Sequence, residues 1–326
     1  MRRARRFLLV IVATVTTGGV VCAAWLLAQS RLDPLEVLRR EPGEVRVVTD
    51  SSYPAVTASG EERRYRDLTI STANAGLVRV TTSRPAEATA EGLPLVVILA
   101  GLRTGREALG VVSEHGPNVL VGYQYPYDAE TWERRSKLWQ IPAVRRAILE
   151  VPWQVTHVVR RLGAEPYVDA ERMALLGYSF GAMFAPATQR LAAEGGLDFD
   201  ATILAFGGVD IAGLVDANLD VSPSVVRRAA AGLMATLVHA IEPELHLPHL
   251  RGRFLVVRAT DDRQIPAGLS ARLAELTPEP REVVTLDGGH MNPRDPELTE
   301  RVVRLSQDWL VRAGVTEPAS GVPPSR

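Results

Sequence analysis

Short apolar runs alternate with longer amphipathic stretches through most of the chain. Leu93 to Ala100 contains no polar side chain, which is typical of a strand buried on both faces of a sheet. Pro142 to Leu162 places Val, Ile and Leu on one helical face and paired arginines on the other, which predicts an amphipathic helix. Further strands are predicted at 118–123, 173–176, 201–206, 253–258 and 281–286, and further helices at 181–193, 223–241, 266–276 and 296–313. This alternation predicts an α/β fold with a doubly wound, mostly parallel sheet.

The ends of the chain have different patterns. Tyr65 to Thr82 alternates apolar and polar residues around Asn74-Ala-Gly76, which predicts a hairpin that leads the sheet as an antiparallel edge. Residues 31–62 mix Pro, Gly, Ser and charged residues, and we interpret them as a stalk or linker. The predicted folded domain is 63–313, and the Pro- and Ser-rich residues 314–326 are predicted to be a disordered tail.

The N-terminus has the pattern of an export signal. Met1 to Arg6 is basic, and Phe7 to Ala28 carries no charge. This run is longer than the about 7–15 apolar residues of a cleaved signal peptide and reaches the ~20 that a membrane span needs. We therefore predict a signal anchor within residues 1–30, with the basic cluster in the cytoplasm and the folded domain extracytoplasmic. Ala28-Gln-Ser30 also fits a cleavage site, which would give a secreted protein instead.

Composition and charge narrow the classes of function. Of the 326 residues, 46% are hydrophobic and 23% are charged, and the net charge is −1. These are ordinary values for a globular protein, and they give no basic footprint for binding a nucleic acid. Cys22 is the single cysteine and lies in the N-terminal apolar run. The folded domain therefore has no disulfide, thiolate metal site or cysteine nucleophile.

The strand and helix predicted at 173–193 meet in the motif Gly177-Tyr-Ser-Phe-Gly181. A G-x-S-x-G sequence between a strand and a helix is typical of a nucleophile elbow, whose sharp turn exposes the serine hydroxyl at the end of a sheet. We expect crowding at this turn to require glycine at both outer positions, pressed against each other. The amide end of the following helix favours negative charge near the serine. Ser179 is the candidate nucleophile, and an ordinary Gly-Ser turn is the alternative.

A serine hydroxyl needs a general base, and the base needs a carboxylate that orients it. Two later strands offer such groups at their carboxyl ends, where open α/β sheets place their sites. The strand at 253–258 runs into Asp261-Asp262, and the strand at 281–286 ends in Asp287-Gly-Gly-His290.

In their order and context, these three motifs resemble those of the α/β-hydrolase superfamily, over about residues 63–313. The resemblance implies that Ser179 is the nucleophile and that His290 is the general base and then the general acid. It implies that Asp262 is the orienting carboxylate, because the family's acid usually lies four residues before the proline of this loop. Asp261 is the alternative carboxylate.

The resemblance also implies an oxyanion hole made of two backbone amides. One belongs to Phe180, the residue after the nucleophile. The other is expected at Leu102, after the strand that ends at Ala100, where the family often has His-Gly and this chain has Ala100-Gly101. No cofactor and no metal ion is expected in this chemistry.

Residues 211–250 separate two strands by more than a helical crossover needs, and the resemblance implies a small helical cap there. His246 and His249 lie within it, but the proline between them spoils helical spacing, so a metal site is not favoured. An aromatic cluster is either a wall of the substrate site or core and loop packing; its members are Tyr123, Tyr125, Tyr127, Trp132, Trp139 and Trp153.

The sequence thus predicts a serine hydrolase that cleaves a carboxylic ester, or as second choice an amide, through an acyl-enzyme on Ser179. Its expected partners are a small-molecule or lipid-like acyl substrate and, through the N-terminal segment, a membrane; no nucleic acid is expected. One alternative is an acyltransferase that passes the same acyl group to an alcohol or glycan. Another is a non-catalytic envelope protein that uses the fold as a binding module.

Overall fold

The computed structural model describes residues 17, 24–25, 27–29, 31–41, 43–74, 76–87, 92–101, 105–112, 115–126, 140–292 and 295–318. Its strands are β1 (Val45–Val56), β2 (Glu62–Thr72), β3 (Gly76–Pro85), β4 (Leu93–Leu99), β5 (Val119–Gln124), β6 (Val168–Tyr178), β7 (Ala201–Ala205), β8 (Arg253–Ala259) and β9 (Arg281–Leu286). Its helices are α2 (Pro34–Leu38), α3 (Arg106–Gly110), α5 (Ile141–Gly163), α6 (Phe180–Glu194), α7 (Ile211–Asn218), α8 (Ser224–Leu237), α9 (Ala267–Leu276) and α10 (Pro296–Arg312).

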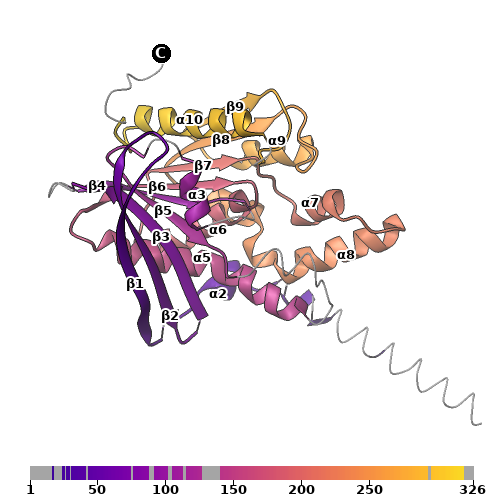
Figure 1. Ribbon diagram of the computed structural model, residues 1–326. Helices are drawn as coiled ribbons and strands as arrows, with labels where there is room; N and C mark the ends of the chain where they lie inside the picture. The colour runs from indigo at the N-terminus through magenta and orange to yellow at the C-terminus, as the bar shows by residue number, and fades with distance from the viewer. Residues whose placement is uncertain are drawn as a thin grey trace, which may run out of the picture.

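The strands form one sheet in the order β1-β2-β3-β5-β4-β6-β7-β8-β9 (Figure 1). The neighbours from β1 to β5 pair antiparallel. From β5 to β9 every neighbouring pair is parallel. The predicted α/β class, with a mostly parallel sheet and an antiparallel leading hairpin, is therefore confirmed.

Helices cover both faces of the parallel half, which explains why its strands β4 and β7 are buried along their whole length. In β4, Leu95, Val97 and Leu99 face a core shared with α5 and α6. The alternate residues Val96 and Ile98 face a second core shared with α3 and α10. Figure 1 shows α10 above the sheet and α5 and α6 below it.

Residues 31–62 are not a stalk, and this prediction is corrected. Leu35 and Leu38 of α2 are buried in the main core, and β1 pairs along its length with β2. The first eight residues of β1 are exposed on both faces. A strand without a buried face needs no alternation of apolar and polar residues, so the sequence pattern resembled that of a linker.

The folded chain also continues past its predicted end at 313. Val315 is 2% exposed and packs beside α10, and Glu317 forms an ion pair with Arg172 at 3.2 Å. The predicted tail therefore starts later than 314, and its last part, 319–326, lies outside the described residues.

The transmembrane anchor predicted within residues 1–30 is also corrected. Most of its apolar run falls outside the described residues. In the part of the chain that the structure describes, no helix is both long and apolar enough to cross a membrane. The prediction gave the length of the run more weight than Thr16-Thr-Gly-Gly19, four weakly apolar residues in its middle.

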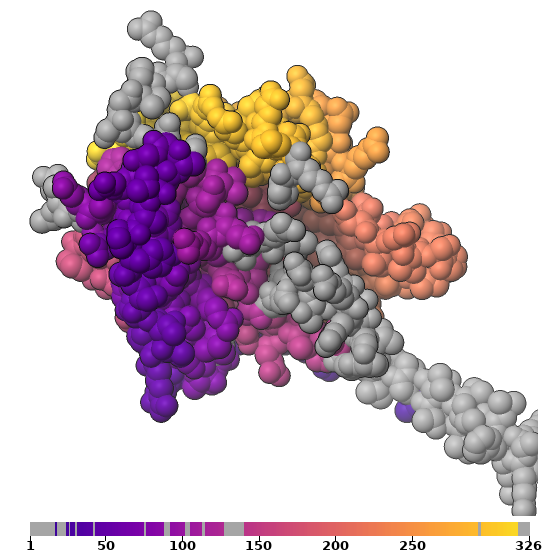
Figure 2. All heavy atoms as spheres, viewed as in Figure 1, coloured from indigo at the N-terminus to yellow at the C-terminus, as the bar shows by residue number. Residues whose placement is uncertain are grey.

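Helices are present where a small helical cap was predicted, at 211–250. α7 and α8 are followed by three short 3-10 turns, η2 (His239–Ile241), η3 (Pro243–Leu245) and η4 (Leu247–His249). Figure 2 shows α7 and α8 projecting from the body of the protein as a lobe of their own. That this insertion covers the substrate stays a prediction.

Candidate active site

Ser179 lies at the turn between β6 and α6, as the nucleophile elbow requires. Its backbone has φ 53° and ψ −117°, a conformation that residues other than glycine rarely adopt. The Ser179 amide donates a hydrogen bond to the Ala205 carbonyl at 2.8 Å, which ties the turn to the end of β7. The side chain is partly exposed, so the strained turn holds an accessible hydroxyl at the carboxyl end of the sheet.

The two glycines of the motif are required by close contacts of different kinds. A Cβ on Gly177 would lie 2.8 Å from Ala182 Cα and 2.9 Å from Gly181 O, inside the turn itself. A Cβ on Gly181 would lie 1.8 Å from Leu99 O, on β4. The expected crowding is thus real for Gly177, whereas Gly181 is needed because α6 begins directly against the neighbouring strand.

His290 links the serine to a carboxylate. Ser179 Oγ lies 2.7 Å from His290 Nε2, and His290 Nδ1 lies 2.7 Å from Asp262 Oδ2. Because a carboxylate only accepts, Nδ1 carries the proton and Nε2 is left to accept from the serine hydroxyl. The side chains of His290 and Asp262 are only 7% and 6% exposed, so water competes little for these bonds.

Backbone contacts fix the loops that carry the histidine and the carboxylate. The Thr260 amide donates to Leu286 O at 3.0 Å, and the Asp261 amide donates to Gly288 O at 2.9 Å. These bonds continue the β8–β9 ladder past both strands. They bring the Asp262 loop alongside the loop that leads to His290.

Asp262 is held as a carboxylate. Its burial alone would raise the carboxyl pKa, but the hydrogen bond with His290 and those donated by the Ile265 and Gln264 amides outweigh burial, so the pKa is lower than usual. Both amides donate to Oδ1 at 2.9 Å, which leaves Oδ2 for the imidazole. Asp261, the alternative, is exposed and accepts from the Thr260 hydroxyl at 3.2 Å.

Phe206, after β7, is a site residue that the sequence analysis missed. Its φ is 55°, its side chain is 1% exposed, and its ring packs edge-on to the His290 imidazole at 5.6 Å between centroids. A bulky residue in this backbone conformation is an outlier that persists only where its surroundings enforce it. The two glycines that follow it were the only signal in the sequence, and they do not specify a contact with His290.

Of the two predicted oxyanion donors, Phe180 is among the described residues and Leu102 is not. Phe180 is the first residue of α6 and follows Ser179 directly. Leu102 lies outside the described residues, which stop at Gly101 in this loop. Gly101 itself is close to the nucleophile, because a Cβ built on it would lie 3.9 Å from Ser179 Cβ.

Three of the six residues in the aromatic cluster lie in the core, and the other three fall outside the described residues. Tyr123, Tyr125 and Trp153 are at most 7% exposed and belong to the main core. For these three, core packing is the better interpretation. Tyr127, Trp132 and Trp139 fall outside the described residues.

His246 and His249 do not converge on a common ligand. His246 is fully buried, and its Nε2 lies 2.8 Å from Ala240 O, whereas His249 is exposed. Within the described ranges, no group of three or more His, Cys, Asp or Glu side chains is arranged to hold a metal ion.

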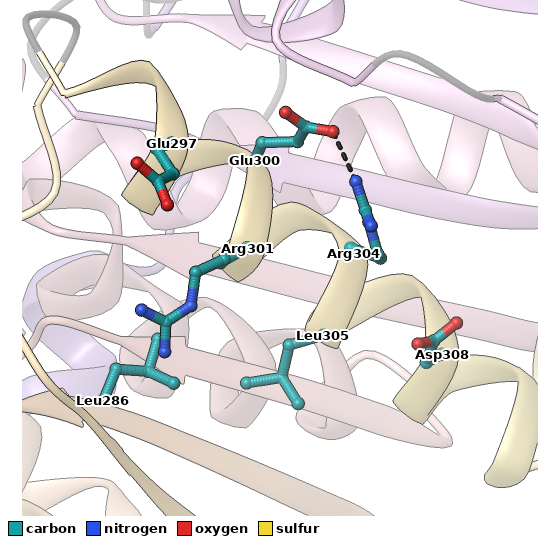
Figure 3. A pocket seen from close by; sticks show the side chains of 7 residues that line it. All are labelled: Leu286, Glu297, Glu300, Arg301, Arg304, Leu305 and Asp308. Carbon is teal, nitrogen blue, oxygen red and sulfur yellow. Dashed lines mark hydrogen bonds and ion pairs between the residues drawn. The ribbon is translucent and has the colours of Figure 1, made fainter. Parts of the chain in front are cut away.

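Ser179, His290 and Asp262 are not among the residues that line the hollow in Figure 3. It is an open hollow of about 470 Å³ between the end of β9 and α10, and it is lined by Leu286, Glu297, Glu300, Arg301, Arg304, Leu305 and Asp308. Five of these seven side chains are charged, and Glu300 pairs with Arg304. The described lining contains no hydroxyl, thiol or imidazole side chain, so the hollow does not compete with the Ser179 site as a place for serine-type nucleophilic catalysis.

At the level of sequence, no protein-family model and no curated protein matches the chain. Solved structures do match its fold. An acetyl xylan esterase from Thermoanaerobacterium sp. JW/SL YS485 is 13% identical with a TM-score of 0.58, covering 86% of this chain and 91% of that one. An acetyl xylan esterase from Paenibacillus sp. R4 is 16% identical with a TM-score of 0.58, covering 83% and 92%. An esterase from Thermogutta terrifontis is 16% identical with a TM-score of 0.54, covering 74% and 92%. With the sheet order and the strand–turn–helix at Ser179, this likeness identifies the chain as a protein of the α/β-hydrolase fold.

Proposed function

We propose that the protein is a serine hydrolase that cleaves carboxylic esters through an acyl-enzyme on Ser179. The observation that carries this proposal is the continuous chain from Ser179 Oγ through His290 to Asp262, with 2.7 Å at each step. A neutral imidazole in contact with a serine hydroxyl, and oriented by a carboxylate, is the arrangement that makes serine a nucleophile.

In the first half of the reaction, Ser179 Oγ attacks the ester carbonyl and His290 Nε2 takes the hydroxyl proton. The tetrahedral intermediate collapses, the bond to the alcohol breaks, and the imidazolium returns the proton to the departing oxygen. Asp262 stabilises the imidazolium without taking its proton. Water then repeats the sequence on the acyl-enzyme, which releases the acid and restores Ser179.

The negative oxygen of the tetrahedral intermediate needs donors aimed at it. The Phe180 amide, at the N-terminus of α6, and the Leu102 amide are the proposed donors. The partial positive charge at the start of a helix adds to their effect.

Ester hydrolysis is preferred over the other uses of an acyl-enzyme because the matched structures named above are esterases. An amide substrate and transfer of the acyl group to an alcohol or glycan use the same first step. Product analysis with and without an added alcohol separates hydrolysis from transfer, since transfer yields a new ester in place of the free acid. A small-molecule acyl substrate fits this proposal, and a location outside the cytoplasm stays a prediction from the N-terminal sequence.

The proposal is tested by treating the full-length protein with a fluorophosphonate and locating the modified residue by mass spectrometry. We expect labelling at Ser179, lost in His290→Ala, together with hydrolysis of short-chain aryl esters that disappears in Ser179→Ala. Circular dichroism of both variants checks that they are folded. Ester turnover that survives Ser179→Ala would sink the mechanism, and a folded wild type that neither labels nor turns over esters would favour a non-catalytic binding protein.

A further inference from the structure

Tyr125 follows β5 and directs its hydroxyl to the end of the neighbouring strand β4. It is 3% exposed, and its hydroxyl donates a hydrogen bond to Ala100 O at 2.8 Å. Ala100 is the residue after β4, where the chain leaves the sheet and passes beside Ser179. A buried tyrosine hydroxyl needs a hydrogen-bond partner, and the partner of Tyr125 is a backbone carbonyl next to the active site.

The ring of Tyr125 contacts the other side of the site. It packs edge-on to Phe180, with 5.6 Å between centroids and 73° between planes, and it also contacts Phe184 at 5.5 Å. Phe180 is the residue after the nucleophile. One side chain therefore touches the backbone that leads to the proposed second oxyanion donor and the side chain of the residue that supplies the first.

The contact with Ala100 O has a direct geometric consequence. A peptide unit is planar, so the Ala100 carbonyl and the Gly101 amide turn together. A hydrogen bond that fixes the carbonyl fixes the direction in which the chain enters Gly101, which lies against Ser179. Oxyanion stabilisation depends on such direction, because the donors act only at about 2.7–3.1 Å from the charged oxygen.

We propose that Tyr125 is a positioning residue for oxyanion stabilisation, acting through its hydroxyl on the Ala100–Gly101 peptide and through its ring on Phe180. The inference rests on the proposed function of Ser179. Tyr125 does not touch the reacting atoms in this role, so it influences the rates of both acylation and deacylation, each of which passes through a tetrahedral intermediate, and not the binding of the ester.

Tyr123 provides a matched control two residues away. It is also buried, at 1% exposure, and its hydroxyl donates to Gln154 Oε1 at 2.7 Å. Gln154 lies on α5, so this bond joins the sheet to a helix and not to the active site. Y125F and Y123F each remove one buried hydroxyl and keep the ring.

The experiment measures kcat and KM for an aryl ester, the rate constant of phosphonylation by a fluorophosphonate, and the urea midpoint for wild type, Y125F and Y123F. We expect kcat and the phosphonylation rate of Y125F to fall about tenfold, less than the roughly 10²–10³-fold loss caused by removing a donor itself. KM should stay within about twofold, because ground-state binding is not affected. Y123F should keep the wild-type kcat while its urea midpoint falls as much as that of Y125F.

Equal kcat values for Y125F and Y123F, each corrected for the folded fraction, would overturn the inference. A rise in KM at constant kcat would also overturn it, since that result assigns Tyr125 to the substrate wall. Failure of the proposed function gives a different result, in which ester turnover in the wild type persists in Ser179→Ala or is absent altogether.

Discussion

Ser179 and Ser83 each hydrogen bond a histidine, and the comparison between them shows what a serine needs to become a nucleophile. Ser83, on β3, lies 2.9 Å from His115 Nδ1, nearly as close as Ser179 lies to His290. Both histidines are at most 8% exposed. By these distances and by the burial of the histidine, the two pairs are alike.

They differ first at the far nitrogen of the imidazole. His290 donates to the carboxylate of Asp262, which stabilises a positive imidazole. His115 Nε2 instead faces the neutral Leu109 carbonyl at 3.2 Å. Burial, and then the nearby charge of Arg63, hold the pKa of His115 below its usual value, so this histidine resists the protonation that a general base must undergo.

They differ also at the serine. Arg63 Nε donates to Ser83 Oγ at 3.1 Å, which occupies a lone pair and draws electron density from the oxygen. Ser83 is fully buried, whereas Ser179 is partly exposed at a strained turn. A nucleophile therefore needs a carboxylate behind the base and a free approach to the hydroxyl, and a serine–histidine contact supplies neither.

The largest effect is expected from removing the charge behind His290 with Asp262→Asn. An amide can donate to Nδ1, which moves the imidazole proton to Nε2 and prevents it from accepting the proton of Ser179. We expect kcat to fall on the order of 10⁴-fold, as for the equivalent change in a serine–histidine–aspartate triad. Steady-state ester hydrolysis measures this, with the rate of fluorophosphonate labelling as a second readout.

Glu61→Gln is the matched control in the other network. Glu61 accepts from Arg63 at 2.9 Å and from the His115 amide at 3.0 Å. The glutamine removes the same charge beside β2, which three strands separate from β6 and Ser179. The urea midpoint should fall while kcat per folded molecule stays unchanged. A loss of activity in Glu61→Gln as large as that in Asp262→Asn would show that the two networks do not have separate roles.

The next largest effect is on stability, from Arg63→Met. Arg63 has no exposed surface and donates to Glu61, Ser83 and Asn118 O. Glu61 is 30% exposed and can be solvated after the substitution, but the buried carbonyls of Ser83, Gly116 and Asn118 lose their donor. A buried acceptor left unsatisfied costs about 1–3 kcal/mol, and we expect a loss of a few kcal/mol in the free energy of unfolding measured by urea. The labelling rate of Ser179 in the folded fraction should not change. If that rate falls severalfold, the contacts of Arg63 with Glu61, Ser83 and Asn118 stabilise the active site as well as the sheet.

The sequence predicts a residue of the active site only where a local sequence pattern marks its position. Ser179, Asp262 and His290 lie at the carboxyl ends of strands that are recognisable from their apolar runs, so topology alone brings them to one edge of the sheet. The conformation of Phe206 and the hydrogen bond of Tyr125 depend on long-range packing. No local pattern specifies them.

The same reasoning explains the errors at the N-terminal side. β1 is exposed on both faces over most of its length, and a strand that buries no face leaves no periodic signal. The burial of Arg63 could not be predicted from the sequence either, because an arginine in an alternating strand normally faces solvent. Only its tertiary partners show that it points inward.

A third buried histidine, His246, extends the comparison to an imidazole with neither a serine nor a carboxylate. Burial lowers its pKa from 6.5 to about 4. Between these two values the unfolded chain binds a proton that the folded protein does not, so stability is complete above pH 6.5 and falls as the pH drops toward 4. The full contribution is on the order of 3 kcal/mol.

Urea unfolding at several pH values tests this, with His246→Gln as the variant. The glutamine can still donate to Ala240 O but does not titrate. We expect the loss of stability between pH 6.5 and 4 to be smaller in His246→Gln than in the wild type, while other buried histidines contribute equally to both. An identical pH slope in the two proteins would contradict the assignment of His246 as a neutral, buried group.

The smallest expected effect is on stability, when Ser83 and Ser179 are each replaced by alanine. We expect the first substitution to lower the stability of the protein and the second not to lower it. Ser83→Ala removes an acceptor from the buried Arg63 and a partner from His115, which leaves two buried groups short of a hydrogen bond and should cost about 1–2 kcal/mol of stability. Ser179→Ala removes a partly exposed hydroxyl from a strained turn. Loss of a functional group at such a site commonly leaves the stability of a protein unchanged or raises it.

Thermal unfolding of the two variants beside the wild type measures the difference: Tm should fall in Ser83→Ala and stay level or rise in Ser179→Ala. If Tm falls equally in both, Ser179 stabilises the fold as Ser83 does, and the contrast between a structural and an exposed serine does not extend to their energetics.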